Sequence, residues 1–243
     1  MFDSGFGGLT VARALIDLLP DEDLVYIGDT GRYPYGSREL GEVRTFSHEL
    51  AHSLVHDYGA KAIVVACNTA TAAGLEEVRA ELDVPVIDVV TPGARALVAT
   101  TVTGRVGVIG TVGTVSSGAY VRAIAETGVP VSLTSAACPG FVEFVERGQT
   151  VGDEVTVLAE RLLAPVVDAG HGAADVAHAP DVSAHGLAAA AAAAEHGAAA
   201  HDTSTEYLLM ALALLLAVGG LLLAISVYRG GTASAGRIAA ATG

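Results

Sequence analysis

The chain has 243 residues, with 27 acidic and 13 basic side chains and a formal net charge of −14. This charge argues against a nucleic-acid partner, because binding to a phosphate backbone calls for a basic surface. Two cysteines, Cys67 and Cys138, do not make a disulfide framework, and no basic or apolar leader opens the sequence. We therefore expect reduced thiols, synthesis in the cytosol, and either one large α/β unit or two small domains.

Apolar runs alternate with helix-length segments over the first 170 residues. The expected elements are, in chain order, a helix from about residue 9, a strand at 24–28, a helix at 45–58, a strand at 62–66, a helix ending near 82, and strands at 85–90 and 106–109. Short β-rich runs separated by helices predict an α/β fold with parallel sheets covered by helices. In such sheets, reactive groups gather where strands end and helices begin.

Cys67 lies at one of these junctions, between the strand at 62–66 and the helix that follows. Unpaired backbone N–H groups and the helix dipole favour a thiolate at such a position. A small buried hydrophobic side chain is an equally good interpretation of a free cysteine. The neighbouring Asn68 and Thr69 favour the functional interpretation, because their amide and hydroxyl can hold a small polar ligand as well as cap the helix.

Other polar groups follow the remaining strands. Asp3 and Ser4 precede a glycine-rich entry to a helix, which can cap that helix or approach a ligand carboxylate. The Tyr-Pro-Tyr-Gly segment at 33–36 is either a rigid loop or a pocket wall. Thr111 and Thr114 open a further helix as caps or as an anion cradle.

The C-terminal third has a different composition. Residues 171–206 are rich in Ala, Gly and His and are expected to form a low-complexity linker. Residues 207–228 contain no charged side chain and are long enough to cross a bilayer as one helix, with a buried core helix as the alternative. Residues 229–243 form a tail. A solvated linker is favoured over metal binding by its histidines, and no metal site is expected anywhere in the chain. The linker histidines are His171, His178, His185, His196 and His201.

Over residues 2–170 the sequence resembles the glutamate racemases of the aspartate/glutamate racemase superfamily. The motifs that carry this resemblance are FDSGFGGLTV at 2–11, GDT at 28–30, YPYG at 33–36, VACNTA at 65–70, GVIGT at 107–111, ACP at 137–139 and FVE at 144–146. The resemblance implies two similar parallel-sheet α/β domains, at 1–92 and 93–170, with the active site between them and the second domain incomplete.

The resemblance also implies the chemistry. Inversion of an α-carbon needs an acid/base group on each face of the substrate, and in this family both groups are cysteines and no cofactor takes part. Cys67 is implied as one base, assisted by Asp3, and Glu146 as the carboxylate that supports the opposite-face thiol. The implied product is D-glutamate for peptidoglycan, made by a cytoplasmic enzyme that can form a homodimer. The residues implied to hold the amino acid are Ser4, Tyr35, Gly36, Asn68, Thr69, Thr111 and Thr114.

The sequence departs from the family at the second thiol. Family members carry Gly-Cys-Thr-His shortly after the segment that ends here at Gly170, whereas this chain continues His-Gly-Ala-Ala-Asp and has no cysteine after Cys138. Cys138 lies in the family's Ala-Cys-Pro motif, and a packing role is expected for it. The tail, in turn, shows a short similarity to a membrane segment of subunit L of NADH-quinone oxidoreductase. The alternative function is therefore a non-catalytic, membrane-anchored binding or interaction protein from a truncated or fused racemase frame.

Overall fold

The computed structural model describes residues 1–101, 103–169 and 176–178. Strands and helices alternate through these residues, and every strand pairing is parallel. The elements are β1 (Phe2–Asp3), α1 (Leu9–Leu18), β2 (Ile27–Gly28), η1 (Tyr35–Ser37), α2 (Leu40–His56), β3 (Ile63–Val65), α3 (Asn68–Glu81), β4 (Val86–Asp88), α4 (Val90–Thr100), β5 (Arg105–Gly110), α5 (Val112–Ser116), α6 (Ala119–Glu126), β6 (Ser132–Ala137), α7 (Phe141–Glu146), α8 (Asp153–Asp168) and β7 (Val176–His178).

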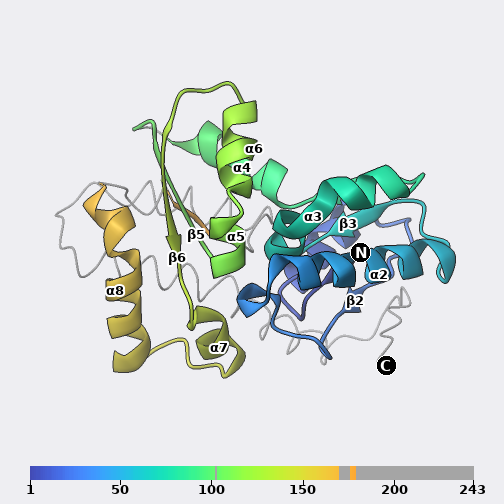
Figure 1. The fold of residues 1–243 in the computed structure, drawn as a ribbon, viewed down its shortest axis with the longest axis horizontal. Helices are drawn as coiled ribbons and strands as arrows, with labels where there is room; N and C mark the ends of the chain where they lie inside the picture. The colour runs from blue at the N-terminus through green and yellow to red at the C-terminus, as the bar shows by residue number, and fades with distance from the viewer. Residues whose placement is uncertain (102, 170–175, 179–243) are drawn as a thin grey trace.

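The first sheet has the strand order β2-β1-β3-β4 and is covered by helices on both faces (Figure 1). Successive side chains of a strand point to opposite faces, so β3 supplies two cores. Ile63 and Val65 pack into the cluster beneath α2 and α3, while Val64 and Ala66 belong to the cluster on the α1 face. A strand buried on both faces explains why this segment is continuously apolar.

The second sheet has the order β6-β5-β7 and lies in the other half of the molecule in Figure 1. Val106 and Val108 of β5 face α4 and α6, whereas Ile109 faces α8. The same alternation therefore builds a second helix-sheet-helix sandwich. Its cores bury Leu97 on one side and Leu163 on the other.

The predicted α/β fold with parallel sheets is confirmed, with corrections to several bounds. The strand expected at 24–28 is reduced to β2. The strand expected at 85–90 stops at Asp88, because the Asp88 carboxylate accepts a hydrogen bond from the Thr91 backbone N–H at 2.6 Å and α4 begins at Val90. The predicted domain boundary at residue 92 therefore falls inside α4.

A short strand lies inside the segment 171–206 that was expected to be a linker. Residues 176–178 form β7, which pairs in parallel with β5 through Gly107↔Val176 and Ile109↔His178. The other residues of the expected linker, and those of the segments at 207–228 and 229–243, lie outside the described residues. None of the described helices is both long and apolar enough to cross a membrane.

Candidate active site

Pairing of β1 with β3 brings Cys67 next to the N-terminal loop. Phe2 pairs with Val65, so the residues that follow each strand meet at the same edge of the sheet. Cys67 is the N-cap of α3, and its Sγ accepts a hydrogen bond from the Ala70 backbone N–H at 3.4 Å. The Cys67 thiol in turn donates to Ser4 Oγ at 3.6 Å. Asp3, Ser4 and Cys67, which were expected at one site, therefore lie next to one another in the structure.

The Asp3 carboxylate is buried beside this thiol and is held by the backbone. Its Oδ2 accepts the Gly8 N–H at 2.8 Å, and the Tyr26 hydroxyl lies 3.5 Å from the same oxygen. Burial raises the pKa of Asp3, while hydrogen bonds from three backbone N–H groups and from Cys67 oppose that rise. The negative charge of Asp3 is therefore poorly solvated, and a nearby proton or cation would stabilise it.

Burial also raises the pKa of the Cys67 thiol to about 12, and the charge of Asp3 adds to the effect. The N–H groups at the start of α3 act in the opposite direction but do not prevail. The thiolate expected at this helix start is therefore not favoured, because the effect of desolvation on the Cys67 pKa is larger than that of the helix N–H groups. In this structure Cys67 is a protonated thiol at neutral pH.

Cys138 is a second buried thiol, outside this site, on which the effect of burial on pKa can be tested. It is buried among Ile109, Phe141 and Leu163, which agrees with the packing role expected for it, and burial raises its pKa to about 12. Because a thiol in the unfolded chain titrates near its ordinary value, the unfolded state loses its protons first as pH rises. The contribution of the two thiols to the free energy of unfolding should therefore be constant below about pH 9 and fall between about pH 9 and pH 12.

Each thiol can contribute a slope of up to about 1.4 kcal/mol per pH unit within that window. Urea denaturation of the wild type and of Cys138→Ala at pH 8 and at about pH 10 checks this expectation. The variant should lose less stability between the two pH values than the wild type does. Equal losses would show that Cys138 does not titrate late in the folded state.

Three threonine hydroxyls form a second polar cluster beside the first. Thr69 Oγ1 lies 3.0 Å from Thr111 Oγ1 and 3.3 Å from Thr114 Oγ1, and the last two are 3.0 Å apart. Thr69 comes from α3, whereas Thr111 and Thr114 come from the N-cap and body of α5. This hydroxyl ring joins the two halves of the molecule at the ends of β3 and β5.

The turn at η1 closes over the hydroxyl ring. Gly36 approaches Thr111 so closely that a Cβ on Gly36 would lie 2.5 Å from Thr111 Cγ2. Tyr35 is buried, and its hydroxyl donates to the Asp29 carboxylate, which also pairs with Arg32 at 2.6 Å. Gly36 thus lies against the hydroxyl ring, whereas the hydroxyl of its neighbour Tyr35 is held by Asp29.

Asn68 makes the other polar link between the halves. Its Oδ1 accepts a hydrogen bond from the Tyr120 hydroxyl of α6 at 2.9 Å, and both side chains are buried. Glu146, at the end of α7, is not in contact with Cys67. Its charge acts instead on Tyr33, whose pKa is raised chiefly by burial and then by Glu146.

Sequence reasoning missed four residues of this site. Tyr26 donates to the Gly5 carbonyl at 2.8 Å and braces the Asp3 loop, and no motif singled it out. Tyr33 and Asp29 lie inside the YPYG and GDT motifs, so the motifs could have indicated them. Tyr33 packs its ring against Gly5, and its buried hydroxyl lies close enough to Glu146 for that side chain to raise the Tyr33 pKa. The fourth, Tyr120, lies in α6, a few residues after the Thr111 and Thr114 hydroxyls.

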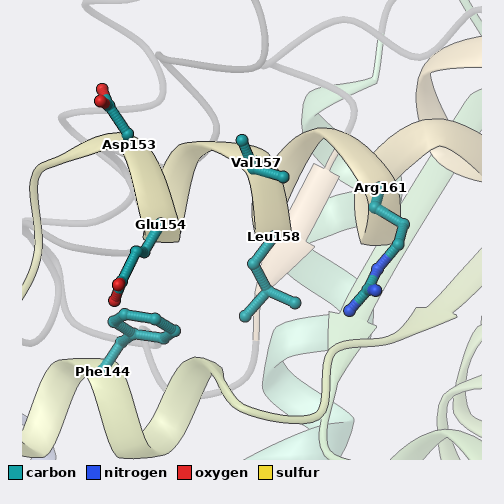
Figure 2. A pocket seen from close by; sticks show the side chains of 6 residues that line it. All are labelled: Phe144, Asp153, Glu154, Val157, Leu158 and Arg161. Carbon is teal, nitrogen blue, oxygen red and sulfur yellow. The ribbon is translucent and has the colours of Figure 1, made fainter.

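A separate hollow of about 530 Å³ lies between α7 and α8 (Figure 2). Phe144, Val157 and Leu158 line it together with Asp153, Glu154 and Arg161. The residues predicted to act on a substrate are not among its lining, so this hollow is not the predicted site.

Comparison with known proteins identifies the family. The profile of the Asp/Glu/Hydantoin racemase family matches residues 9–176. The chain belongs to this family. The match ends at Val176, the first residue of β7, and so extends a few residues past residue 170, where the resemblance was expected to end. The chain is 53% identical over 170 residues to a glutamate racemase of Mycobacterium ulcerans (strain Agy99), an alignment that covers 70% of this chain and 62% of that relative.

Solved structures agree on the fold. Glutamate racemase isoform RacE1 from Bacillus anthracis is similar with a TM-score of 0.66 and 34% identity, over 94% of this chain and 81% of that one. A glutamate racemase from Francisella tularensis in complex with D-glutamate has a TM-score of 0.69 at 29% identity, over 98% and 84% of the two chains. The predicted similarity of the tail to NADH-quinone oxidoreductase is not shown by these matches and stays a prediction.

Proposed function

We propose that the chain acts on glutamate as a cofactor-independent amino-acid racemase, in which Cys67 exchanges the α-proton. The observation that carries the proposal is the contact set at the end of β1 and β3, where Cys67 is held by Ser4 and Ala70 beside the buried Asp3. Family membership and the relatives named glutamate racemase support the choice of substrate. The chain spans about 62% of the length of that Mycobacterium relative, so the activity of the whole enzyme is a proposal for this chain.

The electrostatics suggest how the thiol is activated. Cys67 is protonated in the ligand-free structure because it is buried beside a negative charge. The ammonium group of a bound amino acid would place a cation near Asp3 and lower the pKa of Cys67. The thiol proton passes to Asp3, the thiolate then takes the α-proton of glutamate, and the electron pair of the C–H bond moves into the substrate carboxylate. Exchange of the abstracted proton with solvent, followed by return of a solvent-derived proton from Cys67 to the same face, completes exchange without inversion.

The second polar cluster supplies the groups that position the substrate. Thr69, Thr111 and Thr114 offer hydroxyl donors, and Asn68 offers an amide. Ser4, Tyr35 and Gly36 come from loops of the first half of the molecule, which also supplies Asn68 and Thr69. We assign these residues to substrate binding. We propose that Glu146 supports an acid/base group on the opposite face of the substrate. The chain has no cysteine after Cys138 that could be this group.

Exchange in deuterated solvent tests this proposal. We expect NMR to show deuterium entering the α-position from one enantiomer of glutamate, while circular dichroism shows much slower net inversion. Absence of exchange from both enantiomers would refute the racemase proposal itself. Rapid, complete racemisation would retain the racemase but refute the one-thiol mechanism.

The finer predictions about location stay proposals. We propose that the racemase half works in the cytoplasm, supplies D-glutamate for peptidoglycan, and forms a homodimer. Anchoring by residues 207–228 is tested by alkaline-carbonate extraction, in which a chain found wholly in the soluble fraction would remove the anchor. The comparisons favour the racemase over the non-catalytic, membrane-anchored alternative.

A further inference from the structure

Two histidines on α2 and one carboxylate at the end of α3 converge between these two helices. His48 Nδ1 lies 2.8 Å from Glu81 Oε2, and His52 Nε2 lies 3.2 Å from the same oxygen. One ligand atom of each side chain lies within 4.8 Å of the others. All three side chains are partly exposed, so an ion from solvent can reach them.

This spacing comes from the helices themselves. Residues four apart lie on one face of a helix, one turn above the other, so His48 and His52 present parallel imidazoles. Their rings stack with centroids 6.1 Å apart and an interplanar angle of 26°. Glu81 is the last residue of α3, and the packing of α2 on α3 that buries Leu50 and Val78 brings its carboxylate to the two rings.

The distances are those of a nearly formed metal site. Zinc binds imidazole nitrogen and carboxylate oxygen at about 2.0–2.2 Å, which places the ligand atoms of a tetrahedral site roughly 3.3 Å apart. The two nitrogen-oxygen distances here are 2.8 and 3.2 Å, and the two nitrogens lie within 4.8 Å of each other, so the side chains have to rotate to admit an ion between them. Two imidazoles and a carboxylate are a ligand set that zinc uses with water in the fourth position.

We propose that His48, His52 and Glu81 bind a divalent transition-metal ion of the zinc class and clamp α2 to the end of α3. This site differs from the expectation that the chain holds no metal, which weighed only the histidines of the tail; its third ligand, Glu81, comes from another helix. The proposal does not depend on the racemase activity.

The sequence around the pair, His48-Glu49-Leu50-Ala51-His52, has the order found on the zinc-binding helix of metallopeptidases. In those enzymes the glutamate activates a metal-bound water. Here the carboxylate of Glu49 forms an ion pair with the Arg32 guanidinium, which draws it away from that role. The geometry therefore supports metal binding without peptide hydrolysis.

The competing interpretation is a ladder of ion pairs between the two helices. Arg44 pairs with Glu77 at 3.4 Å one turn before the cluster, and His48 with Glu81 can continue that ladder without any metal. The two interpretations differ in what a metal titration shows. A ladder predicts no saturable high-affinity site, while a clamp predicts one that requires all three side chains.

Calorimetric titration of the full-length chain, purified without a histidine tag, with Zn²⁺ decides between them. We expect a site whose affinity falls at least about tenfold in His52→Gln and in Glu81→Gln, the latter preserving size and hydrogen bonding to the rings. His56→Gln is the matched control, since His56 stacks on His52 at 5.6 Å but is not one of the three ligands. Its affinity should equal that of the wild type.

Zinc can also bind the histidines of the tail or the thiols, so a second readout is needed. Saturating Zn²⁺ should raise the thermal unfolding temperature of the wild type and of His56→Gln, and leave that of Glu81→Gln unchanged. The Co²⁺-loaded protein should lack the intense thiolate absorption that Cys67 or Cys138 would produce. Equal zinc affinity in the wild type and in Glu81→Gln, or an equal loss in His56→Gln and His52→Gln, would overturn the proposal.

Discussion

Replacing Cys67 with serine should slow exchange of the glutamate α-proton with solvent by about 10²–10⁴-fold. The serine hydroxyl can still accept the Ala70 N–H and contact Ser4, so the start of α3 is preserved. A hydroxyl is far less acidic than a thiol, and it cannot act as a base toward a carbon acid. The initial rate of deuterium incorporation, measured by NMR for each enantiomer, checks this prediction.

The matched control is Cys138→Ala. Cys138 has the same raised pKa and similar burial but lies among apolar side chains beneath α8. Its exchange rate should match that of the wild type once the fraction of folded protein is equal. An equal loss in both variants would mean that the exchange responds to stability, and Cys67 would lose its assignment as the base.

Gly36→Ala should destabilise the protein by about 1–3 kcal/mol and disturb the substrate site at the same time. The added Cβ would lie 2.5 Å from Thr111 Cγ2 and 2.7 Å from Thr111 Cβ, distances that force η1 and α5 apart. Movement of Thr111 breaks its contacts with Thr69 and Thr114. Urea denaturation measures the first effect, and the exchange rate of the folded variant measures the second.

Gly41 offers the opposite case a short distance along the chain. It lies inside α2, and a Cβ there would meet no atom within 4 Å. Gly41→Ala should therefore stabilise the protein by roughly 0.5–1 kcal/mol, because alanine loses less backbone entropy in a helix. If Gly36→Ala proved as benign as Gly41→Ala, the close approach of η1 to α5 would be refuted.

The helices and buried strands could be predicted because their patterns are local. The start of α1 at Leu9, the run of α3 to Glu81 and the strand Ile63–Val65 follow from apolar periodicity and from a continuous β-branched run. The short strand β1 and the strand β7 could not be predicted this way. Each has few residues, and each owes its pairing to a neighbouring strand that is distant in the sequence.

For the site, the resemblance to the glutamate racemases implied Asp3, Ser4, Cys67, Thr69 and Thr111 as members of one site. It could not foresee the sign of the pKa shift at Cys67, which depends on how much water the folded chain excludes. It also could not foresee the hydrogen bond between Asn68 and Tyr120, because 52 residues separate the two in the sequence.

The ring of threonine hydroxyls has one further property. Each hydroxyl carries a single proton and can both donate and accept. The hydrogen bonds among Thr69, Thr111 and Thr114 can therefore run round the ring in either direction. Reversing the direction moves only hydrogen atoms. A carboxylate that displaces one link receives a donor at once, and the amide of another ligand would find an acceptor at the same place. The junction between the two halves can thus adapt its polarity to a ligand while every heavy atom stays in position.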